Sequence, residues 1–509
     1  MRTAPRRIAI GAAAVLVAAA ALVSVVLTSA PRDGDIQTST PATSALPPVA
    51  AAVVAPPTRV ILTPTAKPAT SQAISWLAGD VSHMVGRVQI RASGGEVRTV
   101  DARAAGTVNG NPLQHFSATV TGLEAATSYE YRVGLDGSWS RWWQFTTADP
   151  TEDDFEFIYY GDAQVGLDST WPSVVRQAEA TAPDAIGSVH AGDLLNRGRD
   201  EADWDDWFTG MGDSAAARNV LAAPGNHEYI DDPLLVAWKA HFEYPANSPT
   251  VATSGALADL AEGDSDIARQ YAAYFQHWGA LASDTVYFTD YDDVRFIALN
   301  ATQDVGFLTP ATLPACADEQ CPSRNVGELW VRFQAAWLDH VLADSPSKWT
   351  VVTFHQPVYS ASPGRDEPIL RAEWVPILQD REVDLVLMGH DHVYARGYNN
   401  DDRTDESGVT DGPVYVVANA GAKHYGLAPE ADNAWTMNNA TQVRRGAGIS
   451  TYQVVTVSQN QLVYRSYVAE RTADATTRRE VGAVFDEFTV TKTDSGRKRV
   501  TEGTGGTSR

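Results

Sequence analysis

Long apolar runs are scarce in this sequence. Only the run from Ile8 to Ala30 is long enough to span a bilayer, which takes about 20 residues. Three arginines among the first seven residues precede this run, and a charged start followed by an apolar core directs export. We therefore expect segment 1–30 to be either a cleaved signal peptide or a retained membrane anchor. In both cases the rest of the chain is expected outside the cytoplasm, secreted or held at the outer face of the membrane.

Cysteine is almost absent, with only Cys316 and Cys321 in the whole chain. Two thiols cannot complete a zinc site by themselves, and no histidine lies near them in the sequence. In an exported protein such a close pair is expected to form a local disulfide, and a metal-binding role is the alternative.

Positive charge is also in short supply, because 39 Lys and Arg residues face 63 Asp and Glu residues, for a net charge of -24. Binding along a nucleic-acid backbone relies on Lys and Arg, so no nucleic-acid docking surface is expected. A small phosphorylated substrate is not excluded, because bound cations would reverse the sign of the charge locally. The length favours two or three domains, and the composition gives no indication of the oligomeric state.

The first part of the chain after the apolar run has two patterns. Residues 31–57 are rich in Ala, Pro, Thr and Val, which predicts a stiff, extended linker. Residues 58–148 contain short alternating runs such as Ala73–Trp76 and Tyr129–Val133, which predict an all-β domain. That domain is interpreted as a spacer packed on the domain that follows it, and the alternative is a domain that binds a ligand or the cell wall.

Strands alternate with helical segments from residue 153 to 470, which predicts a layered α/β domain. Within it, residues 245–284 resemble an insertion with one helix around Ile267–His277, expected to shape the rim of the substrate pocket. A further β segment is predicted at 471–493, and the polar, Gly-rich residues 494–509 are expected to be disordered.

Five short stretches each follow a hydrophobic strand with a residue that can bind metal. Ligands gather at the carboxyl ends of strands in open α/β sheets. Carboxylate, amide and imidazole groups suit borderline divalent ions such as zinc, manganese and iron. The stretches are Tyr160–Gln164, Gly192–Gly198, Pro224–Glu228, Phe354–His355 and Gly389–His392.

Taken together, these motifs resemble those of calcineurin-like metallophosphoesterases, in particular the purple acid phosphatase-like branch. The resemblance rests on Gly-Asn-His-Glu at Gly225–Glu228, on Gly389–Arg396, and on Tyr287–Tyr291 followed by Arg295–Asn300. It covers roughly residues 58–467. The resemblance implies a four-layer sandwich of mixed β-sheets flanked by helices, preceded by an all-β fibronectin type III-like sandwich.

The resemblance also implies two adjacent divalent metal ions. Asp193 would bridge the two ions. The other implied ligands are Asp162 and His392 for the first ion, and Asn226, His355 and His390 for the second. The rings of an alternating His-x-His can reach two ions that lie about 3.5–4 Å apart.

Two positions depart from the family pattern. Purple acid phosphatases carry a tyrosine ligand three residues after the bridging aspartate, where this chain has Asn196. Phenolate coordination colours those enzymes and favours ferric iron, so this protein is expected not to be purple and its metals stay open among Fe, Zn and Mn. The wider superfamily often has His two residues after the first Asp, where this chain has Gln164. Either amide is a candidate to complete the first metal site.

The implied activity is hydrolysis of phosphomonoesters by a hydroxide held on the metals. His227 is the candidate that protonates the leaving oxygen. Arg197 is the candidate that holds phosphate oxygens, with an ordinary surface ion pair as the alternative. His424 is the candidate that lines the pocket. A phosphodiesterase or nucleotide hydrolase with the same site is one competing function, and a surface-binding protein with a degenerate phosphatase domain is another.

Overall fold

A computed structural model of the chain describes residues 55–151, 154–406, 409–492 and 498–503. The expected signal or anchor segment, 1–30, and nearly all of the expected linker, 31–57, lie outside these ranges. Within the described ranges, no helix combines the length and the apolar character needed to cross a membrane.

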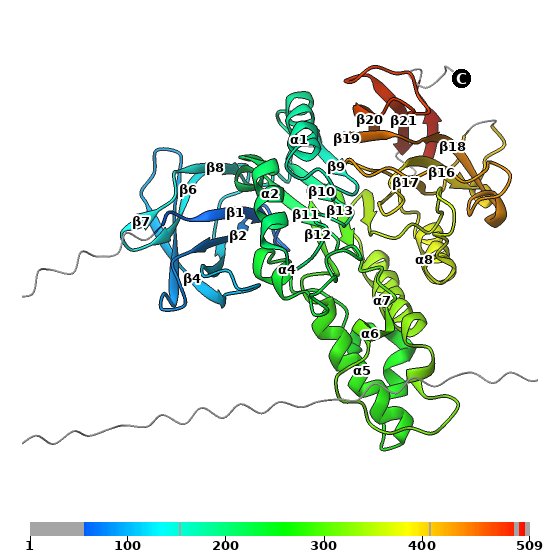
Figure 1. Ribbon diagram of the computed structural model, residues 1–509, viewed down its shortest axis with the longest axis horizontal. Coiled ribbons are helices and arrows are strands. Elements are labelled where there is room, and N and C mark those ends of the chain that lie inside the picture. The colour runs from blue at the N-terminus through cyan, green and yellow to red at the C-terminus, as the bar shows by residue number, and fades with distance from the viewer. Residues whose placement is uncertain (1–54, 152–153, 407–408, 493–497, 504–509) are drawn as a thin grey trace, which may run out of the picture. The chain divides into compact units, whose positions relative to one another are not determined.

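The N-terminal domain is built entirely from β-strands (Figure 1). Large aromatic side chains, among them Trp76, Phe116 and Tyr131, form its core. The strands follow the order β1-β2-β5-β4-β3-β6-β7, and β8 also pairs with β6. Their bounds are β1 (Thr58–Thr63), β2 (Ser71–Ala78), β3 (Val85–Ala92), β4 (Arg98–Gly106), β5 (Gln114–Thr121), β6 (Ser128–Leu135), β7 (Ser138–Trp139) and β8 (Trp143–Thr146).

The second domain contains two mixed sheets. The first has the order β22-β21-β20-β19-β9-β10-β11, in which β9, β10 and β11 are parallel to one another. Its strands are β9 (Phe155–Tyr160), β10 (Gly187–His190), β11 (Asn219–Ala222), β19 (Ile449–Val457), β20 (Gln461–Arg471), β21 (Val484–Lys492) and β22 (Lys498–Glu502).

The second sheet has the order β12-β13-β14-β15-β17-β16-β18, with β13, β14, β15 and β17 parallel. Its outer strands are antiparallel to their neighbours. The strands are β12 (Tyr287–Tyr291), β13 (Val294–Ala298), β14 (Trp349–Thr353), β15 (Leu385–Met388), β16 (Tyr394–Asn399), β17 (Val414–Val417) and β18 (Ala440–Gly446).

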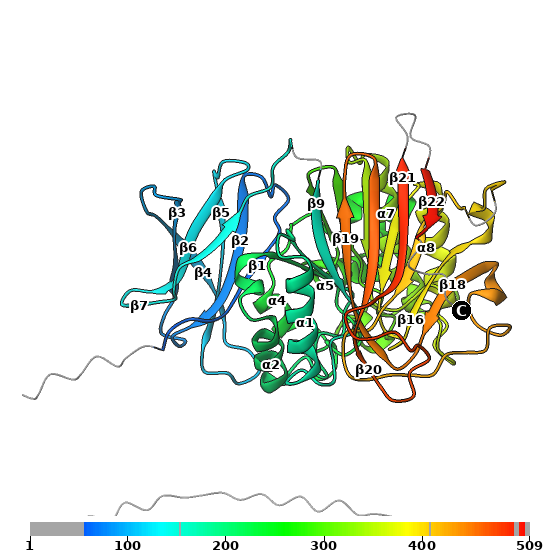
Figure 2. The ribbon, with the colours of Figure 1, turned by 90° about the horizontal axis from the view of Figure 1, so that it is seen from above.

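The two sheets of this domain lie against each other (Figure 2), and the side chains of β9 show which core each face of its sheet contacts. Successive side chains of a strand point to opposite faces. Phe157 and Tyr159 belong to the core between the two sheets, where the Phe157 ring contacts that of Phe296 on β13 at 5.1 Å. Ile158 and Tyr160 belong to a second core, with the first group of helices.

Helices cover the outer face of each sheet. On the first sheet they include α1 and α2, and on the second α5, α7 and α8. The predicted four-layer α/β sandwich behind an all-β domain is therefore confirmed. The α-helices are α1 (Thr170–Thr181), α2 (Glu201–Met211), α3 (Ser214–Ala217), α4 (Val236–His241), α5 (Asp266–Ala282), α6 (Val305–Leu308), α7 (Val326–Ala343) and α8 (Pro368–Asp380). The 3-10 turns are η1 (Val251–Thr253), η2 (Gly255–Ala261), η3 (Pro322–Arg324), η4 (Asn400–Asp402) and η5 (Thr436–Asn438).

The N-terminal domain joins the first sheet through backbone pairing. Strand β1 pairs with β11 in parallel on one side and with β2 on the other. Side chains add to this junction, since Gln72 donates to Asn219 Oδ1 at 2.8 Å and Tyr131 donates to the Ala216 carbonyl at 2.6 Å. The guanidinium of buried Arg59 contacts Asp205 at 2.8 Å. The domain is thus packed firmly against the α/β domain.

Two buried histidines face each other at this junction. The His115 ring of β5 meets the His241 ring of α4 edge-on, with ring centroids 4.6 Å apart. Burial, reinforced by the positive charge of Arg59, lowers the pKa of His115 from 6.5 to about 4. The folded protein therefore keeps His115 neutral at pH values where the unfolded chain is already protonated.

The free energy of unfolding should therefore decrease as the pH is lowered. Below pH 6.5 His115 binds a proton in the unfolded state, whereas in the folded state it stays neutral down to about pH 4. Acid therefore favours the unfolded state. Between roughly pH 7.5 and pH 5, we expect the free energy of unfolding of His115→Phe to decrease by about 2 kcal/mol less than that of the wild type. Urea unfolding of both proteins at the two pH values measures this difference. The matched variant His83→Gln, at a surface histidine, should keep the wild-type pH dependence, and an unchanged slope in His115→Phe would contradict the expectation.

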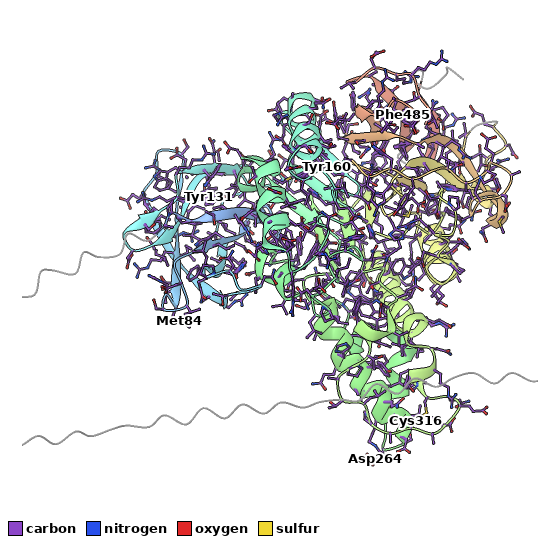
Figure 3. All side chains as sticks on the ribbon, in the orientation of Figure 1. Met84, Tyr131, Tyr160, Asp264, Cys316 and Phe485 are labelled. Atoms are coloured by element: carbon purple, nitrogen blue, oxygen red, sulfur yellow. A yellow bond between two sulfur atoms is a disulfide. The ribbon has the colours of Figure 1, made fainter. Side chains whose placement is uncertain are left out.

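The segment 245–284 carries helix α5, longer than the predicted helix around Ile267–His277. α5 packs along α7, where the Phe275 and Phe333 rings stack at 5.4 Å. The predicted disulfide is confirmed, because Cys316 is bonded to Cys321 in the loop before α7. Figure 3 labels Cys316 and Asp264 at the far end of this helical part.

The expectation of a disordered tail from residue 494 is wrong for part of it. Lys498–Glu502 forms β22, which pairs with β21 at the edge of the first sheet. Buried contacts hold this strand in place, since Lys498 Nζ donates to the Val383 carbonyl at 2.7 Å and Glu502 accepts from Arg396 at 2.6 Å. These partners come from distant parts of the chain, so the polar composition of the segment does not predict its order.

Candidate metal centre

Polar residues follow six strand ends at one edge of the two sheets. The parallel strands β9, β10 and β11 of the first sheet, and β14, β15 and β17 of the second, all point their carboxyl ends toward this edge. The residues that follow these strands in order are Asp162, Asp193, Asn226, His355, His390 and Asn419.

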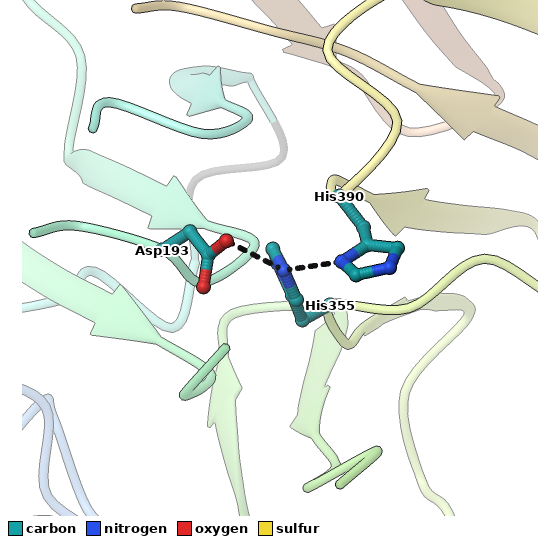
Figure 4. A group of neighbouring side chains, drawn as sticks. All are labelled: Asp193, His355 and His390. Carbon is teal, nitrogen blue, oxygen red and sulfur yellow. Dashed lines mark hydrogen bonds and ion pairs between the residues drawn. The ribbon is translucent and has the colours of Figure 1, made fainter. Parts of the chain in front are cut away.

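Asp193 lies at the centre of this group. Its carboxylate is buried, and Oδ2 lies 3.0 Å from His355 Nε2. The same His355 nitrogen lies 3.1 Å from His390 Nδ1 (Figure 4). Asp193, His355 and His390 together place one ligand atom each within 4.8 Å of one another. Asn226 Oδ1 adds an amide oxygen 3.2 Å from His355 Nε2.

A second group shares Asp193. Asp162, Asp193 and His392 also place their ligand atoms within 4.8 Å of one another. Gln164 lies between them, because its Nε2 is 2.8 Å from Asp193 Oδ2 and 3.2 Å from His392 Nε2. The structure thus brings together the six residues assigned as ligands and Gln164, with Asp193 common to both groups.

Backbone geometry at this edge is specialised. Asp193, His390 and His392 all have positive φ values, of 51°, 74° and 49°. Side chains rarely adopt this region, and such strain is concentrated at functional sites. Gly389 allows the close approach that this geometry needs, since a Cβ there would lie 2.5 Å from Asp162 Oδ1.

Other buried groups orient these ligands. Glu228 accepts hydrogen bonds from the backbone amides of Asp193, Leu194 and Gly225, so it fixes the turn that carries Asp193. His355 Nδ1 lies 2.7 Å from the Ala191 carbonyl, which turns Nε2 toward the cluster. Such partners outside the ligand set fix ring orientation and tautomer in metal proteins.

Burial and neighbouring charges shift the pKa values of the cluster in opposite directions. Burial raises the pKa of Asp162 to about 7. Burial also opposes protonation of His355, but Asp193 and Asp162 outweigh it and raise its pKa to about 9. Burial lowers the pKa of His392 to about 3, which keeps its ring neutral and able to bind a metal.

His227 sits at the edge of the cluster with one ring nitrogen engaged. Its Nδ1 lies 2.8 Å from the Asn196 carbonyl, and its Nε2 lies 4.0 Å from Asp193 Oδ2. The ring is partly exposed, with 22% of the side-chain surface accessible. Nε2 therefore faces the cluster from a ring that substrate can reach, as a proton donor requires.

Three sequence candidates contact other groups instead. Asn196 donates to Asp203 from its side-chain Nδ2, at 3.4 Å, and from its backbone amide. Arg197 is exposed and pairs with Asp231 at 3.0 Å, which is the ordinary surface ion pair named above as the alternative. His424 reaches the cluster only indirectly, since its Nδ1 lies 3.4 Å from Asn419 Nδ2.

Sequence reasoning missed Asn419 and Arg365. Asn419 Oδ1 lies 3.1 Å from His392 Nδ1, and its position after strand β17 is the same signal that identified the other ligands. Arg365 Nη2 donates to the His390 carbonyl at 2.8 Å. Arg365 follows no strand, so no pattern of that kind identified it.

The donor set fits divalent metal ions. Among the residues that the structure describes, the buried atoms Asp162 Oδ2 and Gln164 Oε1 have no hydrogen-bond partner. A bound cation would satisfy both, since oxygen and imidazole donors suit Zn, Mn and Fe. The shared Asp193 provides the bridging carboxylate that a pair of ions needs.

Comparison with known proteins gives two family matches. The model for "Purple acid Phosphatase, N-terminal domain" matches residues 57–147. The model for "Calcineurin-like phosphoesterase" matches residues 157–394. The two matches cover the all-β domain and the strand ends that supply Asp162, Asp193, Asn226, His355, His390 and His392.

Similar whole proteins are distant. An uncharacterized protein of Mycobacterium tuberculosis, found in two strains, is 26% identical over 314 residues, which cover 55% of this chain. The chain spans about half the length of these curated relatives, since the match covers 50% of each. A purple acid phosphatase from yellow lupin (Lupinus luteus) seeds has a TM-score of 0.61 at 17% identity, covering 87% of this chain and 75% of that one. The structure of PhoD gives a TM-score of 0.54 at 14% identity, covering 87% and 92%. These two structural likenesses establish the fold.

Proposed function

This chain carries a purple acid phosphatase N-terminal domain followed by a calcineurin-like phosphoesterase domain, and on that premise we propose that it is an exported phosphomonoesterase with two divalent metal ions. One observation carries the proposal. Asp193 is common to two groups of ligand atoms, each within 4.8 Å, which is how a bridged pair of ions is held. Phosphate ester hydrolysis is the reaction that such a pair serves in this family.

The residues that would hold the ions are those of the two groups. Asp162, His392 and Gln164 would serve the first ion, His355, His390 and Asn226 the second, and Asp193 both. When bound, the ions supply Lewis acidity to phosphoryl oxygens and lower the pKa of water from about 15.7 to about 7. With Asn196 in the place of a tyrosine and directed to Asp203, no phenolate belongs to this ligand set.

His227 provides the proton for the leaving group in this proposal. The Asn196 carbonyl accepts from Nδ1, which fixes the ring and leaves Nε2 to donate toward the substrate. Glu228 and Asn419 keep the surrounding turns and the His392 ring in place. A positioned proton donor of this kind contributes about 10²–10⁴-fold to rate.

Two observations support export. An arginine-containing start precedes the apolar run Ile8–Ala30, a pattern that directs proteins out of the cytoplasm. Cys316 and Cys321 form a disulfide, and disulfides persist in oxidising compartments.

The test compares hydrolysis of an aryl phosphate monoester with that of the matching diester, using metal-stripped protein with Mn, Zn or Fe restored in turn. The proposal predicts faster turnover of the monoester, and only after a metal is restored. Faster turnover of the diester would overturn the monoesterase assignment in favour of a phosphodiesterase. Full activity in stripped protein would overturn the role of the metals, and no turnover of either ester would favour a surface-binding role.

A further inference from the structure

A tyrosine extends the cluster on the side of His392. The Tyr425 ring meets the His392 ring edge-on, with centroids 4.9 Å apart. The Tyr425 backbone amide donates to the His392 carbonyl at 3.2 Å, which ties the backbones of the two residues together. Tyr425 is half-buried, which leaves part of its ring toward solvent.

Two cationic side chains lie against this tyrosine. The Arg365 guanidinium carbon is 5.0 Å from the Tyr425 ring centroid, and Lys423 Nζ is 5.2 Å from it. Arg365 is also held by the His390 carbonyl at 2.8 Å and faces Asp391 at 3.5 Å. Cations within about 6 Å of an aromatic face are attracted to it, so the ring orders both side chains.

Lys423 differs from Arg365 in that no carboxylate forms an ion pair with it among the described residues. Within the described parts of the chain, Arg365 faces Asp391 whereas no carboxylate pairs with Lys423, although the protein carries a net charge of -24. Its backbone carbonyl accepts from Asn419 Nδ2 at 3.0 Å, which ties it to the residue that orients His392. The half-buried ammonium of Lys423, next to the candidate metal centre, is therefore suited to bind an anion.

We propose that Lys423, ordered beside Arg365 on Tyr425, forms a subsite that binds a second anionic group on the leaving group of the substrate. The inference rests on the proposed phosphoesterase function and defines its substrate class. The preferred substrate is a phosphomonoester whose leaving group carries a further phosphate or carboxylate.

The contacts of Lys423 favour a second group over the scissile phosphate. The scissile phosphate must contact the ions that His392 would help to hold, whereas Lys423 Nζ lies 5.2 Å from the centroid of the Tyr425 ring, and it is that ring which contacts His392. A lysine ammonium binds phosphate or carboxylate as a point charge and tolerates either geometry. The subsite therefore selects for charge on the leaving group and not for one particular anion.

Binding of phosphonates tests the proposal without any reaction. The manganese-loaded full chain is titrated by calorimetry with phenylphosphonate and with 4-carboxyphenylphosphonate, which differ only in the second anionic group. We expect the wild type to bind the carboxylated compound about tenfold more tightly, as one charge-assisted contact allows. In Lys423→Gln this ratio of dissociation constants should fall to about 1.

Two control variants isolate the charge at this position. Lys423→Arg keeps the cation and should keep most of the ratio. Lys67→Gln removes one positive charge at an exposed site of the N-terminal domain and should keep the full ratio. A wild-type ratio near 1, or an unchanged ratio in Lys423→Gln, would overturn the subsite.

Turnover of phenyl phosphate and 4-carboxyphenyl phosphate separates this proposal from the proposed function. Hydrolysis of both esters with no binding preference would refute the subsite and leave the phosphoesterase assignment intact. A clear binding preference with hydrolysis of neither ester would support the anion subsite and refute the phosphoesterase assignment.

Discussion

Asp193→Asn is expected to reduce turnover of an aryl phosphate monoester by on the order of 10³-fold or more, because several kcal/mol of charge stabilisation depend on the paired ions. Asp193 is the one residue common to both ligand groups, so the substitution weakens both ion sites at once. It also removes a negative charge that balances two cations. Steady-state kinetics and metal content per protein, measured together, should show that activity and metal are lost in parallel.

A matched control for this variant is Asp339→Asn on α7. Asp339 is about half exposed and pairs with Arg381 at 2.7 Å, away from the ligand set. The same chemical change there should leave turnover and metal content within about twofold of wild type, as surface substitutions usually do. If the Asp193→Asn variant retained both ions and full turnover, the bridging role of Asp193 would be refuted.

Asp486→Ala should lower the free energy of unfolding by about 3–5 kcal/mol, since it breaks a buried ion pair. Asp486 on β21 and Arg396 on β16 are both fully buried and meet at 2.6 and 2.9 Å. Tyr394 also donates to Asp486 at 2.8 Å. The pair links a strand of each sheet. Among the described residues, its loss leaves the buried Arg396 with Glu502 as its remaining carboxylate partner. Urea unfolding monitored by tryptophan fluorescence measures the change.

The neighbouring variant Glu487→Ala provides the comparison. Glu487 pairs with Arg465 at 2.7 Å on the partly exposed side of the same strand. Exposed pairs of this kind contribute about 0–1 kcal/mol, so the effect should be small. Equal losses in the two variants would show that disturbance of β21, and not burial of the charge, sets the stability.

Strands that are buried on both faces were predictable from the sequence, because they appear as short hydrophobic runs. The hydrophobic strand predicted before the Tyr160–Gln164 stretch is β9, because its apolar side chains face a core on both sides of the strand. A second regularity, that parallel strands deliver the residues after them to one edge, marked the stretches that carry the ligands, and the family resemblance implied the ligand set itself. Asn419 obeys the same rule after β17 and could have been found in this way.

Contacts between loops were not predictable, because they depend on distant partners. Arg197 was expected to hold phosphate, but Asp231 pairs with it at the surface. Asn196 stands where the family has a metal ligand, yet Asp203 engages its amide. Arg365 lies in a loop with no periodic pattern, and only the fold brings it to the His390 carbonyl. Strand β22 was missed for the same reason, since its partners Val383 and Arg396 lie far away in the sequence.

The pairing of β1 with β11 has a consequence for how this architecture is inherited. A domain joined to its neighbour only by a linker can be gained, lost or exchanged by recombination without harm to either part. Here the N-terminal domain covers the edge of β11, and without it that strand would present open backbone groups that recruit other chains. The two domains should therefore behave as one evolutionary unit, and substitutions along β1 should be compensated by changes along β11.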